Sequence, residues 1–268
     1  MPYFLNPPQT AQLMKQIPNI FTLLNLFFGC LAIIVILQSG IGLVTTADGV
    51  QMMNMPEQIF MASLFIALAA VVDFFDRFLA RLMNASSAMG KQLDSLADVV
   101  SFGVAPGLII YQFLRLSVAR GADGLDASVA WLLPALLLPC AAAWRLAKFN
   151  LDEAQTYHFK GVPTPAVGLL VASFPLIFWH SSVAAVTDIF LNKWIWYVVV
   201  LVLSWLMVSN IPIMSLKFKD YSFKHNSSKW ILIIVAVILV VLFKWAAVPL
   251  IFIAYILLSL PLKNKIAS

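Results

Sequence analysis

Long apolar runs follow one another along most of this sequence and restrict the chain to a membrane-embedded helical fold. Hydrophobic residues make up 62% of its 268 residues and charged residues only 11%, which is far from the composition of a water-soluble domain. A helix needs about 20 apolar residues to cross a bilayer. The sequence therefore predicts an all-α, polytopic membrane bundle of about eight transmembrane helices, at about 19–39, 59–83, 91–116, 127–148, 164–187, 193–209, 229–244 and 246–262.

We expect a single membrane-embedded domain that covers residues 1–268. Residues 1–18 are polar and rich in proline, and they are expected to form an interfacial segment at the N-terminus. Residues 229–262 are expected to form a C-terminal helix pair. Only Lys244 and Trp245 separate the last two runs, so these could instead be one segment kinked at Pro249.

The basic residues predict the orientation of the chain. Lysine and arginine accumulate in the cytoplasmic loops of membrane proteins. With the N-terminus inside, 13 of the 17 basic residues fall on the cytoplasmic side and 4 on the outer side. We therefore expect both termini in the cytoplasm, and the net charge of +5 requires no nucleic acid partner.

Four aspartates lie at helical spacing inside two neighbouring apolar runs. Asp73 and Asp76 are three residues apart, Asp94 and Asp98 are four apart, and Gly90 lies one step earlier on the same helical stripe. The connection between the two runs is short, so the carboxylates of two antiparallel helices can face one another at the cytoplasmic side.

Such a cluster predicts a site for divalent metal. Ionised carboxylates are costly to bury in a membrane, and four together repel one another unless cations lie between them. Ligation by oxygen alone suits Mg²⁺ or Mn²⁺, and two ions would balance the four charges. Arg81 could hold a phosphate and Gly90 could let a ligand approach, which indicates metal-assisted phosphoryl or phosphatidyl transfer.

The pattern Asp-x2-Asp-x3-Ala-Arg-x8-Gly-x3-Asp-x3-Asp resembles the signature of the CDP-alcohol phosphotransferase family. The resemblance implies a six-helix core, here with two further helices, and an enzyme in which an alcohol cleaves the pyrophosphate of a CDP-linked lipid and releases CMP. One position departs from the family, because Arg77 stands where glycine is usual. Arg77 could neutralise phosphate charge. Its long aliphatic side chain could instead point away from the nucleotide, or it could obstruct the nucleotide and impair the enzyme.

The resemblance also implies roles for individual residues. Asp73, Asp76, Asp94 and Asp98 would ligate metal, and Asp98 would also be the general base for the acceptor hydroxyl. Thr22 and Asn25 would contact the nucleotide, although hydrogen bonds that cap or join helices would also explain such residues. The full set expected to bind the CDP-lipid is Asn19, Thr22, Asn25, Arg77, Ala80, Arg81 and Gly90.

Segments outside this motif resemble the serine-accepting bacterial branch of the family, at 18–25, 94–106, 145–150, 159–165 and 209–212. The implied substrates are CDP-diacylglycerol and L-serine, with CMP as a product, and the implied setting is a homodimer among the lipids of a bacterial cytoplasmic membrane. Arg145 and Lys148 would hold the serine carboxylate or a lipid phosphate, unless they only anchor the helix at the cytoplasmic surface. Asn150 would hold the serine ammonium.

Three alternatives stay open at this point. The acceptor could be another alcohol, such as glycerol 3-phosphate. The chain could be a catalytically impaired homologue because of Arg77. The aspartates could instead bind the coupling ion of a cation-driven membrane carrier, although that hypothesis gives no reason for Ala80, Arg81 and Gly90.

Overall fold

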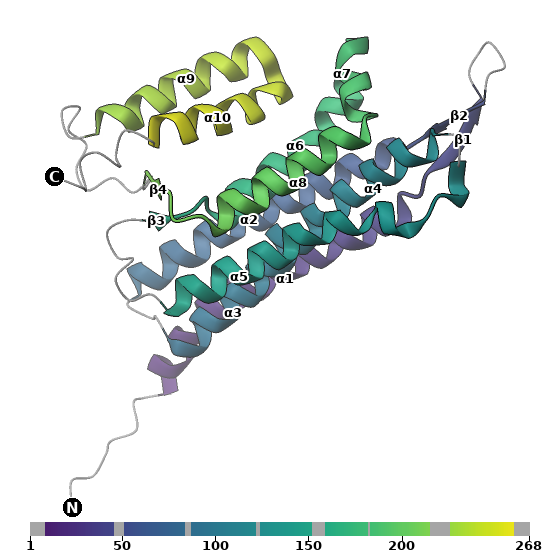
Figure 1. Cartoon of the computed structure of the whole chain (residues 1–268). Helices are drawn as coiled ribbons and strands as arrows, with labels where there is room; N and C mark the ends of the chain where they lie inside the picture. The colour runs from purple at the N-terminus through teal and green to yellow at the C-terminus, as the bar shows by residue number, and fades with distance from the viewer. Residues whose placement is uncertain are drawn as a thin grey trace, which may run out of the picture.

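The computed structural model describes residues 9–45, 51–83, 87–121, 124–151, 159–181, 183–214 and 226–259, and it confirms the all-α membrane architecture (Figure 1). The helices run side by side in a bundle. Their bounds are α1 Gln9–Gln38, α2 Phe60–Leu82, α3 Ala88–Val99, α4 Ala105–Ala119, α5 Leu137–Leu151, α6 Thr164–His180, α7 Ala184–Phe190, α8 Lys193–Val208, α9 Ser227–Phe243 and α10 Ala247–Ser259.

The predicted count of eight spans is not confirmed. Within the described residues, four stretches are long and apolar enough to cross a membrane, and the bent pair α7 and α8 would add a fifth. α6 is apolar but shorter. The four stretches are Pro18–Gln38, Glu57–Leu82, Ala88–Ala119 and Ser227–Ser259, by length and composition alone; the last consists of α9, a 3-10 turn and α10.

Three predicted boundaries differ from the structure. The predicted span 164–187 is broken, because α6 ends at His180 and a separate helix, α7, begins at Ala184. α1 continues through Pro18 instead of beginning after it, so the N-terminal segment and the first span share one helix from Gln9 onward. The predicted span 127–148 begins as short 3-10 turns, and its α-helix starts only at Leu137. Pro134 lies in the last of these turns and lacks the amide hydrogen that a continuous helix needs there.

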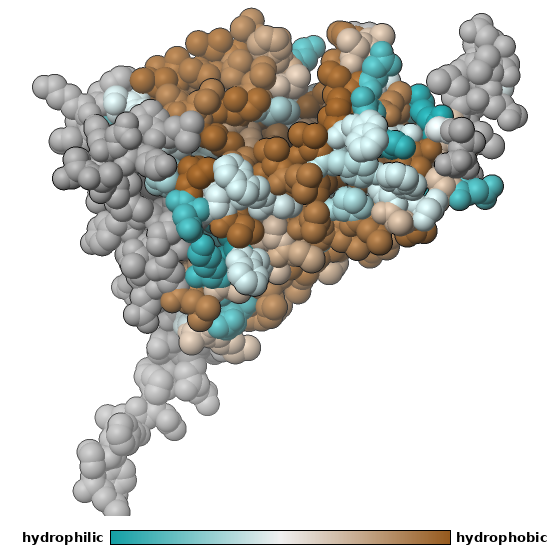
Figure 2. Space-filling view, viewed as in Figure 1, coloured by the Kyte–Doolittle hydropathy of each residue, from teal (hydrophilic) through white to brown (hydrophobic). Residues whose placement is uncertain are grey.

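α9 and α10 form a C-terminal helix pair rather than one kinked segment. Lys244 has a φ of 49°, a left-handed conformation that ends α9, and a single 3-10 turn (η7, Lys244–Ala246) leads into α10. The two helices contact each other and run back along one another in Figure 1. Figure 2 shows apolar side chains over this pair, as expected for helices that face lipid.

The helices that carry the aspartates both pack on α1. α1 contacts α2 along its length and also contacts α3. α3 passes through a π-helical turn (η2, Val100–Val104) into α4, so that one continuous segment crosses the bundle. This π turn contacts α1, α5 and α6, which places it at the centre of the bundle.

Small residues let the helices approach closely around η2. A Cβ atom added at Gly29 of α1 would lie 2.3 Å from the Ser101 hydroxyl, and one added at Gly103 would lie 2.9 Å from the Ala142 methyl of α5. Small residues are common where membrane helices pack closely, and both glycines lie at such contacts. Gly168 of α6 packs in the same way against Phe102.

Two short antiparallel ribbons join the helices. β1 (Gly42–Thr45) pairs with β2 (Gln51–Asn54) between α1 and α2. β3 (Phe159–Lys160) pairs with β4 (Pro212–Ile213), and fixes the entry to α6 beside the end of α8. Gly161 directly follows β3 with a φ of +75°, and an added Cβ there would meet the Met207 carbonyl oxygen, so this turn requires glycine.

Candidate active site

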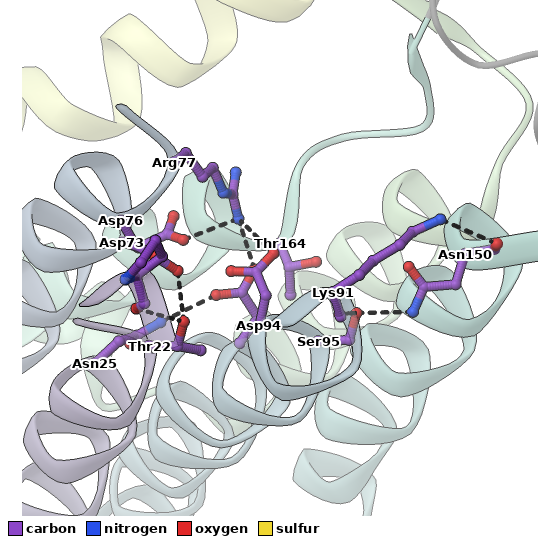
Figure 3. A network of polar contacts seen from close by, with 12 residues as sticks. Thr22, Asn25, Asp73, Asp76, Arg77, Lys91, Asp94, Ser95, Asn150 and Thr164 are labelled. Atoms are coloured by element: carbon purple, nitrogen blue, oxygen red, sulfur yellow. Dashed lines mark hydrogen bonds and ion pairs between the residues drawn. The ribbon is translucent and has the colours of Figure 1, made fainter. Parts of the chain in front are cut away.

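The aspartates of α2 and α3 converge at one end of the bundle (Figure 3). Asp73, Asp94 and Asp98 each offer a carboxylate oxygen, and these three oxygens lie within 4.8 Å of one another. Asp98 is 1% exposed and Asp73 is 5% exposed, whereas Asp94 lies nearer the surface with 29% of its side chain exposed. Asp76, one helical turn beyond Asp73, is also buried.

α1 contributes two buried hydrogen-bond donors to this cluster. The Thr22 hydroxyl donates to Asp76 Oδ2, and the Asn25 amide donates to Asp98 Oδ1 over 3.2 Å. The Ser101 hydroxyl in turn donates to the Asn25 backbone carbonyl, 3.0 Å away. Thr22 and Asn25 therefore join α1 to α2 and α3, which is the helix-joining interpretation that the sequence left open.

Arg77 lies among the carboxylates. Its Nη2 is 3.0 Å from Asp73 Oδ1, 2.9 Å from Asp98 Oδ2 and 3.7 Å from Asp94 Oδ2. The Arg77 side chain is 45% exposed. Its guanidinium nevertheless contacts the carboxylates of Asp73 and Asp98, which are almost fully buried. Arg77 thus places one positive charge among four acidic groups.

Three buried carboxylate oxygens lack any hydrogen-bond partner in the part of the chain that the structure describes. Two of these are Asp76 Oδ1 and Asp94 Oδ1; the third, Asp73 Oδ1, also accepts no hydrogen bond but lies 3.0 Å from the Arg77 guanidinium as an ion pair. A buried acceptor without a partner is costly, and a hard cation satisfies it directly. Because the donor set is all oxygen and the charge is incompletely balanced, these residues fit a divalent metal such as Mg²⁺ or Mn²⁺.

The start of α3 is held close to α1. Ser87 caps α3 by accepting a hydrogen bond from the Gly90 amide over 2.9 Å. A Cβ at Gly90 would lie 2.9 Å from Asn19 Oδ1, so the absence of a side chain at Gly90 lets Asn19 reach α3. Ala80 is half-buried on α2, and Arg81 is exposed in the last turn of that helix.

Arg145 and Lys148, the two basic residues of α5, have hydrogen-bond partners that the sequence did not predict. Arg145 is buried, and its Nη1 donates over 2.7 Å to the Thr164 hydroxyl at the start of α6, while its Nε has no partner in the described residues. Lys148 donates over 2.7 Å to Asn210 Oδ1, which follows α8.

Asn150 belongs to a bridge between α3 and α5. Its side-chain amide donates to the Ser95 hydroxyl over 2.8 Å, and its backbone carbonyl accepts from Lys91 Nζ over 3.3 Å (Figure 3). Ser95, Ser101 and Thr164 are the site residues that sequence reasoning missed. Ser95 and Ser101 carry a weak signal, because they lie next to Asp94 and one turn beyond Asp98; the only signal at Thr164 is its position in the segment 159–165.

Comparison with known sequences identifies the family. A sequence model described as CDP-alcohol phosphatidyltransferase matches residues 15–205, more than half of the chain. The chain belongs to this family. The matched region contains α2 and α3 and therefore all four aspartates. Members are in general metal-dependent, and the cluster of Asp73, Asp94 and Asp98 could hold a metal ion.

Several curated relatives bear the name CDP-diacylglycerol–serine O-phosphatidyltransferase. The protein of Helicobacter pylori strain 26695 is 30% identical over 227 residues, which is 83% of this chain and 80% of the relative. The protein of Bacillus subtilis strain 168 is 39% identical over 121 residues, 42% of this chain and 60% of the relative. That of Saccharomyces cerevisiae is 38% identical over 125 residues, 43% of this chain and 41% of the relative.

Proposed function

We propose that this protein transfers the phosphatidyl group of CDP-diacylglycerol to the hydroxyl of L-serine, which gives phosphatidylserine and CMP. The observation that carries this proposal is the coincidence of two findings. A relative named for this reaction aligns over 83% of the chain, and acidic residues of α2 and α3 lie together in one site.

Asp73, Asp76, Asp94 and Asp98 would hold the metal. Asp76 Oδ1 and Asp94 Oδ1 support this assignment, because both are buried and have no hydrogen-bond partner within the residues that the structure describes. A bound divalent ion supplies charge neutralisation at the pyrophosphate and orients it for displacement. Gly90 and Asn19, which lie together beside the cluster, would contact the CDP-lipid, and Arg81 would pair with its phosphates from the exposed last turn of α2.

The reaction is a displacement at phosphorus. The serine hydroxyl oxygen forms a bond to the phosphorus that carries the diacylglycerol, and the bond from that phosphorus to the bridging oxygen of the pyrophosphate breaks. CMP leaves with the bridging oxygen. Asp98 would accept the hydroxyl proton, and its orientation is fixed by Asn25 and Arg77 on its two oxygens.

The acceptor would bind on the α5 side of the cluster. Arg145 is buried there, and its Nε has no hydrogen-bond partner in the described ranges, which supports a role in holding the serine carboxylate. Lys148 and Asn150 would complete this side, Lys148 near a lipid phosphate and Asn150 near the serine ammonium. Their hydrogen bonds to Asn210 and Ser95 hold both residues at the same end of the bundle.

The protein would lie in the cytoplasmic membrane of a bacterium as a homodimer, with this site and both termini in the cytoplasm. The distribution of charge supports the orientation. Arg77, Lys91 and Arg145 lie at the end of the bundle that holds the site, whereas Arg120 and Lys193 lie at the other end of their helices.

An acceptor assay tests the function. Purified protein in detergent is supplied with CDP-diacylglycerol, Mn²⁺ and one acceptor at a time, and CMP release is measured. We expect release with L-serine and none above background with glycerol 3-phosphate. Release with glycerol 3-phosphate alone would show the same chemistry with a different acceptor. No release with any acceptor, from protein that is folded, would contradict the proposal and favour an ion carrier or an impaired homologue.

A further inference from the structure

Arg77 occupies the position where an ion bound by Asp73 and Asp98 would lie. Its Nη2 bridges these two carboxylates at 3.0 and 2.9 Å, and it lies 3.7 Å from Asp94. These are the three residues whose oxygens come within 4.8 Å of one another. The guanidinium therefore takes the place of a cation in the tightest part of the cluster.

A divalent ion and this guanidinium exclude each other at that position. Mg²⁺ needs its ligand oxygens at about 2.0 to 2.1 Å. An ion at that distance from both Asp73 and Asp98 would lie against the guanidinium nitrogen that already bridges the same pair. Two cations in contact repel strongly when the groups around them are buried.

The buried oxygens that Arg77 does not neutralise lie on Asp76 and Asp94. Asp76 Oδ1 and Asp94 Oδ1 are buried and have no hydrogen-bond partner in the described residues, and the two carboxylates repel each other electrostatically. The Arg77 guanidinium lies closer to the carboxylates of Asp73 and Asp98 than to those of Asp76 and Asp94. This half of the cluster is therefore the half that still lacks a cation.

We propose that Arg77 permanently replaces one of the two cations that four such carboxylates would otherwise bind, so that each chain holds a single divalent ion, on the side of Asp76 and Asp94. The inference rests on the proposed function only in assigning these carboxylates to metal. It narrows the metal ligands proposed above to Asp76 and Asp94, because Asp73 and Asp98 bind the guanidinium of Arg77 instead. Arg77 is then a structural cation of the site and does not obstruct it.

Counting bound Mn²⁺ by electron paramagnetic resonance tests this proposal without any substrate. The purified full-length protein in detergent is titrated with Mn²⁺. We expect one ion per chain with the signal of an isolated ion. In Arg77→Gly we expect two ions per chain and an exchange-coupled signal, because ions in two-metal sites lie about 3.5 to 4 Å apart. Two ions in the unsubstituted protein, or one ion in folded Arg77→Gly, would overturn the proposal.

Three further variants keep the experiment decisive. Glycine inside a helix lowers stability by roughly 1 kcal/mol. Arg77→Gln, which removes the charge and keeps a helix-forming side chain, is therefore measured beside Arg77→Gly and should also bind two ions. Arg77→Lys keeps a cation and should bind one. Arg120→Gln, far from the site, should leave the count unchanged.

The count also separates this inference from the serine reaction. If the acceptor assay fails while the ion count is one and rises to two in Arg77→Gly, the proposed reaction is wrong and the role of Arg77 stands. If no variant binds Mn²⁺, the role of Arg77 is wrong whatever the acceptor assay shows.

Discussion

At the scale of single residues, the site balances buried negative charge with groups from three helices. Four carboxylates face one guanidinium and two neutral donors, and one oxygen each on Asp76 and Asp94 has no hydrogen-bond partner among the described residues. Every charge that is uncompensated in a membrane raises the free energy of the folded state. Binding of a further cation should therefore stabilise the site. Each neutral donor stabilises one carboxylate, Thr22 that of Asp76 and Asn25 that of Asp98.

Replacing Thr22 by valine should lower stability more than replacing it by serine. Valine matches threonine in shape but leaves Asp76 Oδ2 without its donor, and losing a hydrogen bond to a charged group costs about 1.5 to 3 kcal/mol. Serine keeps the hydroxyl. Thermal unfolding in detergent should show a clear drop in midpoint for Thr22→Val and a small one for Thr22→Ser. Equal midpoints for the two variants would contradict the assignment of this hydrogen bond.

The convergence of the aspartates could be predicted from the sequence, because spacings of three and four residues place side chains on one helical face and a short connection makes the two helices antiparallel neighbours. The position of Arg77 could not. Its contacts with Asp73 and Asp98 depend on how α1 sets the distance between α2 and α3. The bond from Arg145 to Thr164 depends likewise on the packing of α5 against α6.

At the scale of elements, the site depends on how closely α1 approaches the π turn η2. Gly29 allows Ser101 to reach the Asn25 carbonyl, and Asn25 in turn reaches Asp98. A π turn places one extra residue in a helical segment, and such turns are frequent at functional sites. Here the turn directly follows α3, which carries Asp94 and Asp98.

Gly29→Ala should therefore destabilise the protein, whereas Gly40→Ala should not. The added methyl at Gly29 would lie 2.3 Å from Ser101 Oγ, while an added methyl at Gly40 would meet no atom within 4 Å in the described part of the chain. Overpacking of this kind costs typically about 1 to 3 kcal/mol. The unfolding midpoint of each variant in detergent is the measurement. A midpoint for Gly29→Ala as high as that for Gly40→Ala would show that the two helices are not in close contact.

The sequence predicted these close contacts but not every helix boundary. Small residues inside apolar runs are a local signal, and Gly29 and Gly103 could be found from it. The apolar pattern did not predict that α5 starts only at Leu137, nor that the chain reverses its direction at Lys244. The hydropathy of an apolar run does not show whether its residues form 3-10 turns or an α-helix. It also does not show whether the run is one long helix or two helices that fold back on each other.

At the scale of the whole molecule, the chain is a membrane bundle with its chemistry at one end. The segment Ala88–Ala119 begins beside the aspartates and has 32 residues, about 48 Å at 1.5 Å per residue, enough to cross a bilayer. Ser87 and Asp126, which flank this segment, should therefore lie on opposite sides of the membrane.

Labelling of single cysteines in intact cells tests that orientation. Cys30 and Cys140 are first replaced by alanine, and cysteine is introduced at Ser87 or at Asp126, both exposed. We expect a membrane-impermeant maleimide to label Asp126→Cys from outside, and Ser87→Cys only after permeabilisation. Labelling of Ser87→Cys in intact cells would place the site on the outer side.

The central claim is that the aspartates of α2 and α3 form one cation site that transfers a phosphatidyl group to serine. Asp94→Asn tests it most directly, because asparagine keeps the shape of Asp94 without its charge, and the ion pair that is lost with Arg77 is a long one at 3.7 Å. We predict that serine-dependent CMP release in the presence of Mn²⁺ falls at least about 100-fold, as expected when one electrostatic element of a transition state is lost. Asp126→Asn, at the other end of the bundle, should leave the rate unchanged. A rate for folded Asp94→Asn equal to that of the unsubstituted protein would contradict the account.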